Sequence, residues 1–192
     1  MRYINVGIAF EGGNDDRVIE AIVRRVMEPS GYTFDYFQPE TPGTMILPYV
    51  PIYVRRFLEN DVDLGIFCTD QDKSPTSRKK DIEEKIKQID ESFLNRAAIA
   101  IPSPHIEAWL LLDDSAIKRL LDIEASSPLP HSDLPPKNRL TAIYHEAQSY
   151  SNSQNQLRVE IAQIMDIEVC ARKDSGFASF LQDIRSAISQ LS

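Results

Sequence analysis

Carboxylates follow two strand-like apolar runs in this sequence. Glu11 and Asp15 come shortly after an N-terminal run, and Asp70 and Asp72 come after a second run that ends at Thr69. Because the carboxyl ends of parallel strands share one edge of a sheet, these acids can converge on one crevice. Converging carboxylates repel one another unless a cation or a proton lies between them. Oxygen ligands suit Mg²⁺ or Mn²⁺, so the leading hypothesis is a metal site.

Most of these acids also have a purely structural explanation. Asp15 and Asp16 would lie in the first turn of a helix, where acidic side chains stabilise the helix dipole. Asp70 and Asp72 would lie in a turn, and aspartate is common there because its side chain binds the local backbone. Helix capping does not explain Glu11. Two glycines follow Glu11, and they allow the backbone to bend sharply and a ligand to approach closely.

Another acid, Glu107, follows a fourth strand-like run and is expected near the same edge of the sheet. Its neighbours from Trp109 onward are apolar, so a carboxylate here needs a partner. A metal ion or the start of a helix could supply that partner. His105 is a candidate proton carrier, although a single histidine near a turn often has no function. Trp109 itself is expected in the core.

The stretch after Asp72 is more basic than the rest of the chain. Residues 73–87 include six Lys or Arg and three acids. Lys73 could offset transition-state charge, and Arg78 and Lys79 could contact a nucleic-acid backbone. The alternative is a solvated helix face with ion pairs between residues four apart. The net charge of -8 argues against binding nucleic acid by bulk electrostatics, but it allows an enzyme that meets phosphates through a metal.

Strand and helix patterns alternate through the first half of the chain. Such alternation predicts an α/β fold with a mainly parallel sheet of about four strands and helices on both faces. We expect strands at 3–10, 32–37, 62–69 and 97–101, and helices at about 15–27, 54–60 and 78–94. Later helices are expected at 106–112, 115–121, 139–149, 156–165 and 177–191. Residues 1–101 would form the core and 102–192 a helical extension packed on it, either covering the sheet or forming a satellite bundle.

The composition predicts a cytoplasmic protein. The 192 residues are 42% hydrophobic, which is enough for a full core. The apolar runs are far shorter than the roughly 20 residues that span a bilayer, so no membrane partner is expected. The N-terminus enters a strand pattern at once, which leaves no room for a signal peptide. Cys68 and Cys170 form neither a disulfide framework nor a zinc spacing, as expected in a reducing compartment.

The motif Glu11-Gly-x-x-Asp15 after the first strand, with Asp70-x-Asp72 after the third, resembles the Toprim domain of topoisomerases, primases and OLD-type nucleases. The resemblance covers roughly residues 1–101. It implies that Glu11 is a general acid or base or a metal ligand. It also implies that Asp15, Asp70 and Asp72 bind Mg²⁺ and that the protein acts on phosphodiesters.

Later motifs resemble a small, stand-alone bacterial Toprim-like family of unknown function. They lie at 107–111, Asp113, 136–137 and 175–180, and Glu107 belongs to the first of them as a further candidate metal ligand. The chain lacks the tyrosine-bearing breakage domain of a topoisomerase and the zinc-binding module of a primase.

Three functions remain open. The first is a Mg²⁺- or Mn²⁺-dependent nuclease, which the resemblance suggests as a phage-defence effector with a partner ATPase. The second is a non-catalytic module that senses a nucleotide or docks on a partner. The third, a response-regulator receiver, also has acids at its first and third strand ends. It fits less well, because no later strand carries the expected lysine at its end.

Overall fold

A computed structural model describes residues 2–11, 15–39, 45–70, 75–147 and 150–191. In this part of the chain, four strands form one parallel sheet in the order β2-β1-β3-β4. The predicted α/β fold with a four-stranded parallel sheet is confirmed. The strands are β1 (Arg2–Phe10), β2 (Tyr32–Phe37), β3 (Leu64–Cys68) and β4 (Ala97–Ala100).

The central strand β1 pairs with β2 on one side and with β3 on the other. The chain therefore reverses its direction of travel across the sheet after β2. Such a reversal leaves a crevice beyond the carboxyl ends of the two strands that flank it. Phe10 at the end of β1 lies beside Cys68 at the end of β3. The residues that follow these two strands therefore leave the sheet at the same place.

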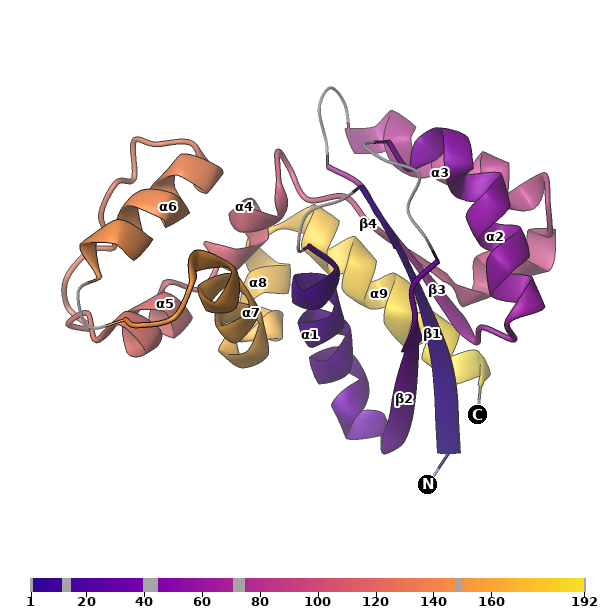
Figure 1. The fold of residues 1–192 in the computed structure, drawn as a ribbon, viewed down its shortest axis with the longest axis horizontal. Coiled ribbons are helices and arrows are strands. Elements are labelled where there is room, and N and C mark those ends of the chain that lie inside the picture. Colours follow the sequence, from indigo (N-terminus) through magenta and orange to yellow (C-terminus); the bar gives the residue numbers. More distant parts are fainter. Residues whose placement is uncertain (1, 12–14, 40–44, 71–74, 148–149, 192) are drawn as a thin grey trace.

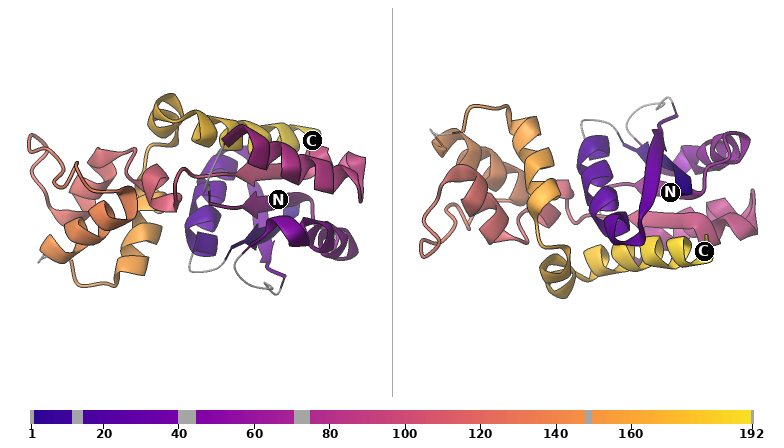
Figure 2. Two further views of the ribbon diagram at one scale, coloured as in Figure 1. Left: turned by 90° about the horizontal axis from the view of Figure 1, so that it is seen from above. Right: turned by 90° about the horizontal axis from the view of Figure 1, so that it is seen from below.

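Helices cover both faces of the sheet (Figures 1 and 2). Alternate strand residues point into two separate cores, as the period of two in a strand requires. Ile8 and Ile66 belong to one core, and Phe67 and Ile99 belong to the other. The first core is covered by α1 (Asp15–Met27) and α9 (Ser175–Gln190), and the second by α2 (Val50–Glu59) and α3 (Pro75–Lys87).

The second core is built around the ring of Phe57. This ring lies 5.6 Å from that of Phe67 and 6.2 Å from that of Phe93, measured between centroids. A Cβ atom on Gly7 would lie 2.5 Å from the Phe57 ring, and one on Gly65 would lie 3.1 Å from it. These two glycines therefore let α2 approach the central strands closely.

The residues after β4 form a helical lobe and then return to the sheet (Figure 1). The lobe lies beside α1, and its helix α7 packs directly against α1. From the lobe the chain enters α9, which packs on β4 and α1. The extension therefore forms a satellite bundle and also covers one face of the sheet, the two arrangements between which the sequence did not decide. Its helices before α9 are α4 (Ile106–Leu110), α5 (Asp114–Leu121), α6 (Pro136–Glu146), α7 (Gln154–Ile164) and α8 (Ile167–Lys173).

Aspartates begin several helices of the extension. The side chains of Asp113, Asp166 and Asp174 accept hydrogen bonds from backbone N–H groups at the starts of α5, α8 and α9. Such caps satisfy N–H groups that have no partner within the helix. Trp109 of α4 is buried, and its ring lies 5.0 Å from that of Phe177 in α9. The expectation that Trp109 belongs to the core is confirmed.

Two helix predictions were wrong in detail. The helix predicted at 78–94 is α3 followed by a separate 3₁₀ helix, η3 (Glu91–Arg96). The Asp90 side chain accepts a hydrogen bond from Ser92 N–H and so starts a new helix there. The short helix α8 was not predicted, because its seven residues complete barely two helical turns.

Within the described part of the chain, no helix is long and apolar enough to cross a membrane.

Candidate functional site

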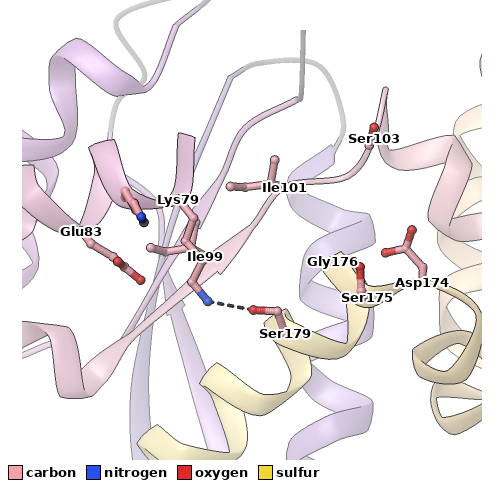
Figure 3. A pocket seen from close by; sticks show the side chains of 10 residues that line it. Lys79, Glu83, Ile99, Ile101, Ser103, Asp174, Ser175, Gly176 and Ser179 are labelled. Atoms are coloured by element: carbon pink, nitrogen blue, oxygen red, sulfur yellow. Dashed lines mark hydrogen bonds between the residues drawn. The ribbon is translucent and has the colours of Figure 1, made fainter. Parts of the chain in front are cut away.

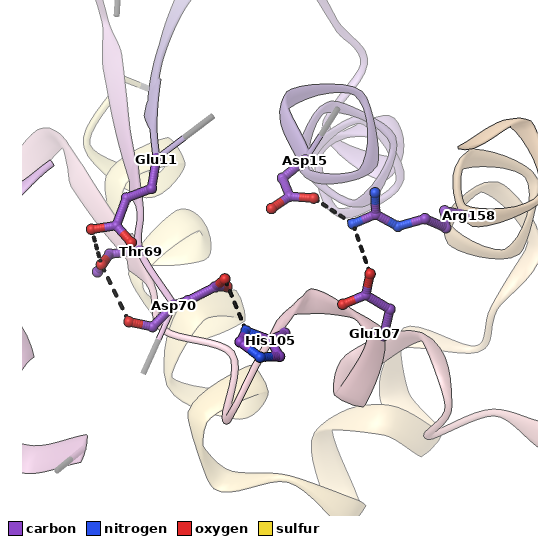
Figure 4. Close-up of polar contacts among 7 residues, drawn as sticks. All are labelled: Glu11, Asp15, Thr69, Asp70, His105, Glu107 and Arg158. Atoms are coloured by element: carbon purple, nitrogen blue, oxygen red, sulfur yellow. Dashed lines mark hydrogen bonds and ion pairs between the residues drawn. The ribbon is translucent and has the colours of Figure 1, made fainter. Parts of the chain in front are cut away.

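Glu11 and Asp70 lie together beyond the ends of β1 and β3 (Figure 4). Thr69 Oγ1 donates a hydrogen bond of 2.6 Å to Glu11 Oε1, and the N–H of Ile46 donates one of 3.1 Å to the same oxygen. Thr69 is itself buried, and its N–H bonds to the carbonyl of Ala100 in β4. The Glu11 carboxylate is thus fixed by the sheet. Of the three acids predicted at one edge of the sheet, Glu11 and Asp70 lie there, and Asp72 lies outside the described residues.

Asp70 pairs with the histidine that precedes α4. His105 Nδ1 lies 3.0 Å from Asp70 Oδ2. Burial raises the pKa of Asp70, the hydrogen bond to His105 lowers it, and the charges of Asp15 and Glu11 raise it, so the pKa lies above its usual value. The ionised carboxylate is therefore disfavoured at this position. A cation bound beside Asp70 would remove that penalty.

A buried arginine links two further acids, Asp15 and Glu107. Arg158 of α7 pairs through Nη2 with Asp15 at the start of α1, and the same atom lies 3.4 Å from Glu107 Oε1 in α4. The side chains of Arg158 and Glu107 are only 10% and 7% exposed. Burial raises the pKa of Asp15 above its usual value, although the charge of Arg158 opposes this shift. The carboxylates of Glu11, Asp15, Asp70 and Glu107, with Thr69 and His105, form what we call the acid cluster.

Arg158 was not among the residues predicted from the sequence. From Arg158, buried residues recur at Ile161, Ala162 and Met165, the last directly after the end of α7, and Leu157 beside Arg158 is buried as well. This i, i+3, i+4, i+7 spacing marks the buried face of an amphipathic helix. A basic residue at such a position needs a buried acidic partner, and this requirement is the signal that could have identified it.

The donor atoms beside Asp70 suit a divalent cation. Glu11 and Asp70 present carboxylate oxygens, and Thr69 presents a hydroxyl, which are the hard ligands that Mg²⁺ and Mn²⁺ prefer. The described residues contain no group of three or more acidic, histidine or cysteine side chains placed to hold a metal ion. Asp72, the third predicted ligand, and Lys73, the predicted catalytic lysine, lie outside the described residues. A further ligand would come from Asp72 or from water.

The two predicted nucleic-acid contacts differ in their surroundings. Lys79 Nζ lies 2.8 Å from Asp183 Oδ2 and 2.8 Å from Ser179 Oγ, both on α9. Its charge therefore has a structural partner. Arg78 is partly exposed and forms no ion pair with any described residue. Phosphate binding by either residue stays a prediction, and Arg78 is the better placed.

A cavity of about 460 Å³ lies between α3, the end of β4 and the start of α9 (Figure 3). Ile99 and Ile101 give it an apolar wall, and Lys80 and Glu83 lie at its side on α3. Its remaining wall includes Ser103, two residues before His105. The loop after β4 thus borders the cavity and also reaches the acid cluster. A ligand of small-molecule size would fit in this cavity.

No family model matches this chain, and no match is found among the curated proteins or the solved structures. The Toprim-like assignment therefore stays a prediction that rests on the acidic motifs.

Proposed function

We propose that this protein is a Mg²⁺- or Mn²⁺-dependent phosphodiester hydrolase that acts on nucleic acid. The observation that carries the proposal is the meeting of Glu11 and Asp70 beyond two adjacent parallel strands. Proteins with this sheet topology bind their ligands at that crevice. A crevice lined by carboxylates suits a metal-bound phosphate better than a free anion, which the acids would repel.

Each residue of this edge has a role in the proposal. Glu11 and Asp70 would hold the metal, with Asp72 as the predicted third ligand. When bound, the metal supplies Lewis acidity toward a phosphoryl oxygen and lowers the pKa of a water. Thr69 holds one Glu11 oxygen through its hydroxyl, and no hydrogen bond from a described residue is found at the other oxygen, which would face the metal. His105 orients the Asp70 carboxylate through Nδ1.

Binding of the substrate would depend on groups outside the acid cluster. Lys73 and Arg78 belong to the segment that follows β3, and they remain the candidates for contact with phosphates. The net charge of -8 makes strong binding by bulk electrostatics unfavourable. A partner protein that delivers the nucleic acid would remove this difficulty, and a partner ATPase in a phage-defence system is part of the same proposal.

Substitution of Glu11 tests the chemistry. Purified protein, alone and with any co-encoded ATPase, is incubated with single-stranded DNA, double-stranded DNA and RNA in Mg²⁺ or Mn²⁺. We expect cleavage by the wild type and its loss in Glu11→Gln, with no change in the circular dichroism spectrum. Glu20→Gln is the matched control, because Glu20 is a partly exposed glutamate of α1 that pairs with Arg24. Absence of cleavage by the wild type on every substrate would remove the nuclease proposal.

A non-catalytic binding module is the second candidate. The cavity between α3, the end of β4 and the start of α9 favours it, because a pocket of this volume suits a ligand of nucleotide size. In that case Mn²⁺ and a nucleotide would each raise the melting temperature, and the nucleotide would be recovered unchanged.

A further inference from the structure

We propose that Arg158 takes the place of a second cation in the acid cluster, so that the cluster binds one divalent ion at Glu11 and Asp70. The inference rests on the proposed function, because it divides the same acids between a metal and a protein cation. Asp15 and Glu107, predicted from the sequence as metal ligands, then belong to the arginine.

The position of the guanidinium supports this division. Arg158 Nη2 contacts Asp15 Oδ1 and lies 3.4 Å from Glu107 Oε1, and it points into the cluster between the two carboxylates (Figure 4). A Mg²⁺ or Mn²⁺ ion shared by these carboxylates would need to approach each oxygen to about 2.0–2.2 Å. The atom Nη2 already occupies the space between them. Both cations cannot lie there together.

The burial of Arg158 makes its displacement unfavourable. The side chain is nine-tenths buried, and its Nε is also buried without a hydrogen-bond partner in the described part of the chain. Asp15 and Glu107 are its only acidic partners there. A metal that took them would leave a buried, unpaired guanidinium, which costs far more than breaking a surface ion pair.

No arginine of the described part of the chain lies between Glu11 and Asp70, the other two acids of the cluster. Glu11 and Asp70 form no ion pair with a Lys or Arg of the described residues, and only His105 contacts them as a possible cation. Four carboxylates and one guanidinium leave three negative charges when His105 is neutral. The charge that a metal would neutralise is thus concentrated at Glu11 and Asp70. Arg158 acts as a positioning residue, because it fixes Asp15 and Glu107 and keeps them from a second ion.

Counting bound metal ions tests the inference without any assay of activity. Mn²⁺ binding to the full chain is followed by isothermal titration calorimetry and by the electron paramagnetic resonance signal of free Mn²⁺. We expect one Mn²⁺ per wild-type chain. Asp70→Asn should weaken binding by at least about tenfold, whereas Asp15→Asn should change the affinity by less than about threefold. Two ions per wild-type chain, or loss of an ion in Asp15→Asn, would overturn the inference while leaving the metal site in place.

Variants of Arg158 give the complementary result. Arg158→Met keeps much of the volume and removes the charge, so Asp15 and Glu107 become free and a second, weaker Mn²⁺ should bind. Arg158→Lys should still bind one ion, and so should the control Arg185→Met, whose exposed pair with Glu168 lies on α8 and α9. A folded Arg158→Met protein that binds one ion would contradict the proposal. If Arg158→Met does not fold, the wild-type and Asp15→Asn counts decide. No Mn²⁺ bound by the wild type would instead remove the metal site, and the inference with it.

Discussion

At Asp70, burial and the charges of two nearby acids act against ionisation, and His105 acts in its favour. Because the pKa of Asp70 is raised in the folded protein, the native state binds more protons than the unfolded chain between about pH 4 and that raised pKa. The stability that protonated Asp70 contributes is complete below this interval and is lost as the pH rises through it. The ionised carboxylate of Asp70 is therefore a source of instability at neutral pH.

We expect Asp70→Asn to stabilise the metal-free protein at neutral pH, because the amide carries no charge to desolvate. The gain should be at most about 1 kcal/mol, since Asp70 is partly exposed. It should shrink as the pH falls toward about 4, where the wild-type carboxyl is protonated. Urea unfolding at several pH values measures this. Asp81→Asn on exposed α3 surface is the control, and an equal effect of both variants would contradict the prediction.

The same substitution should abolish stabilisation by metal. In the proposed site Mn²⁺ would bind the native state and not the unfolded chain, so millimolar Mn²⁺ should raise the melting temperature of the wild type. Asp70→Asn should show little of that rise in differential scanning fluorimetry. Wild type and variant that respond alike to Mn²⁺ would mean that the acid cluster holds no metal.

At the scale of elements, Asp183 joins α9 to two other elements. Its carboxylate accepts a hydrogen bond of 3.2 Å from the Ile99 N–H of edge strand β4 and pairs with Lys79 of α3. One side chain therefore satisfies the edge of the sheet and links the helices on its two faces.

We expect Asp183→Ala to cost about 1–3 kcal/mol, because it leaves the Ile99 N–H without its partner and removes the acidic partner of Lys79, which keeps only its contact with Ser179. Lys79→Met keeps the bond to Ile99, so it should cost only about 0–1 kcal/mol. Urea unfolding of the two variants measures this order. The reverse order would show that the ion pair outweighs the strand contact. Weaker nucleic-acid binding by Lys79→Met at unchanged stability would support the phosphate contact instead.

The inner strands β1 and β3 pack tightly against α2. A Cβ on Gly7 would lie 2.5 Å from Phe57, so Gly7→Ala should force the ring to move and cost about 1–3 kcal/mol. A second change, Phe57→Leu, should recover part of that loss. Gly31→Ala is the comparison: a Cβ there meets nothing within 4 Å, but the φ of 72° is unfavourable for alanine. Phe57→Leu should therefore not rescue Gly31→Ala, as chemical denaturation of all the variants would show.

For the whole molecule, the net charge of -8 sets how it can meet nucleic acid. In EDTA and at physiological salt we expect little binding to a labelled oligonucleotide, because few cations are available to replace its counterions. Added Mg²⁺ or Mn²⁺ should increase binding by the wild type but not by Asp70→Asn. Fluorescence anisotropy at several salt concentrations measures this. Tight binding in EDTA with a steep salt dependence would mean that a basic surface of the protein, and not the acid cluster, binds the oligonucleotide.

The parts of the site that depend on short segments could be predicted from the sequence. Glu11 and Asp70 follow strands directly, so the alternation of strands and helices was enough to place them at one edge. Arg158 could not be placed in this way, because it lies 143 residues after its partner Asp15. That contact depends on how α7 packs against α1, and helix packing leaves little trace in local spacing. The same reason kept the sequence from deciding that α9 covers the sheet.

The packing of α9 on β4 and α1 affects how the protein is synthesised. A ribosome adds about 5–20 residues per second, so the sheet leaves it several seconds before α9 does. During that delay Ala98 and Ala100, which face the core that α9 completes, lack their cover. The first core therefore cannot close before α9 has emerged, and until then its uncovered apolar side chains are available to chaperones. We therefore expect a chain that stalls after α8 to be less stable than the chain with α9, because this core stays open on one side.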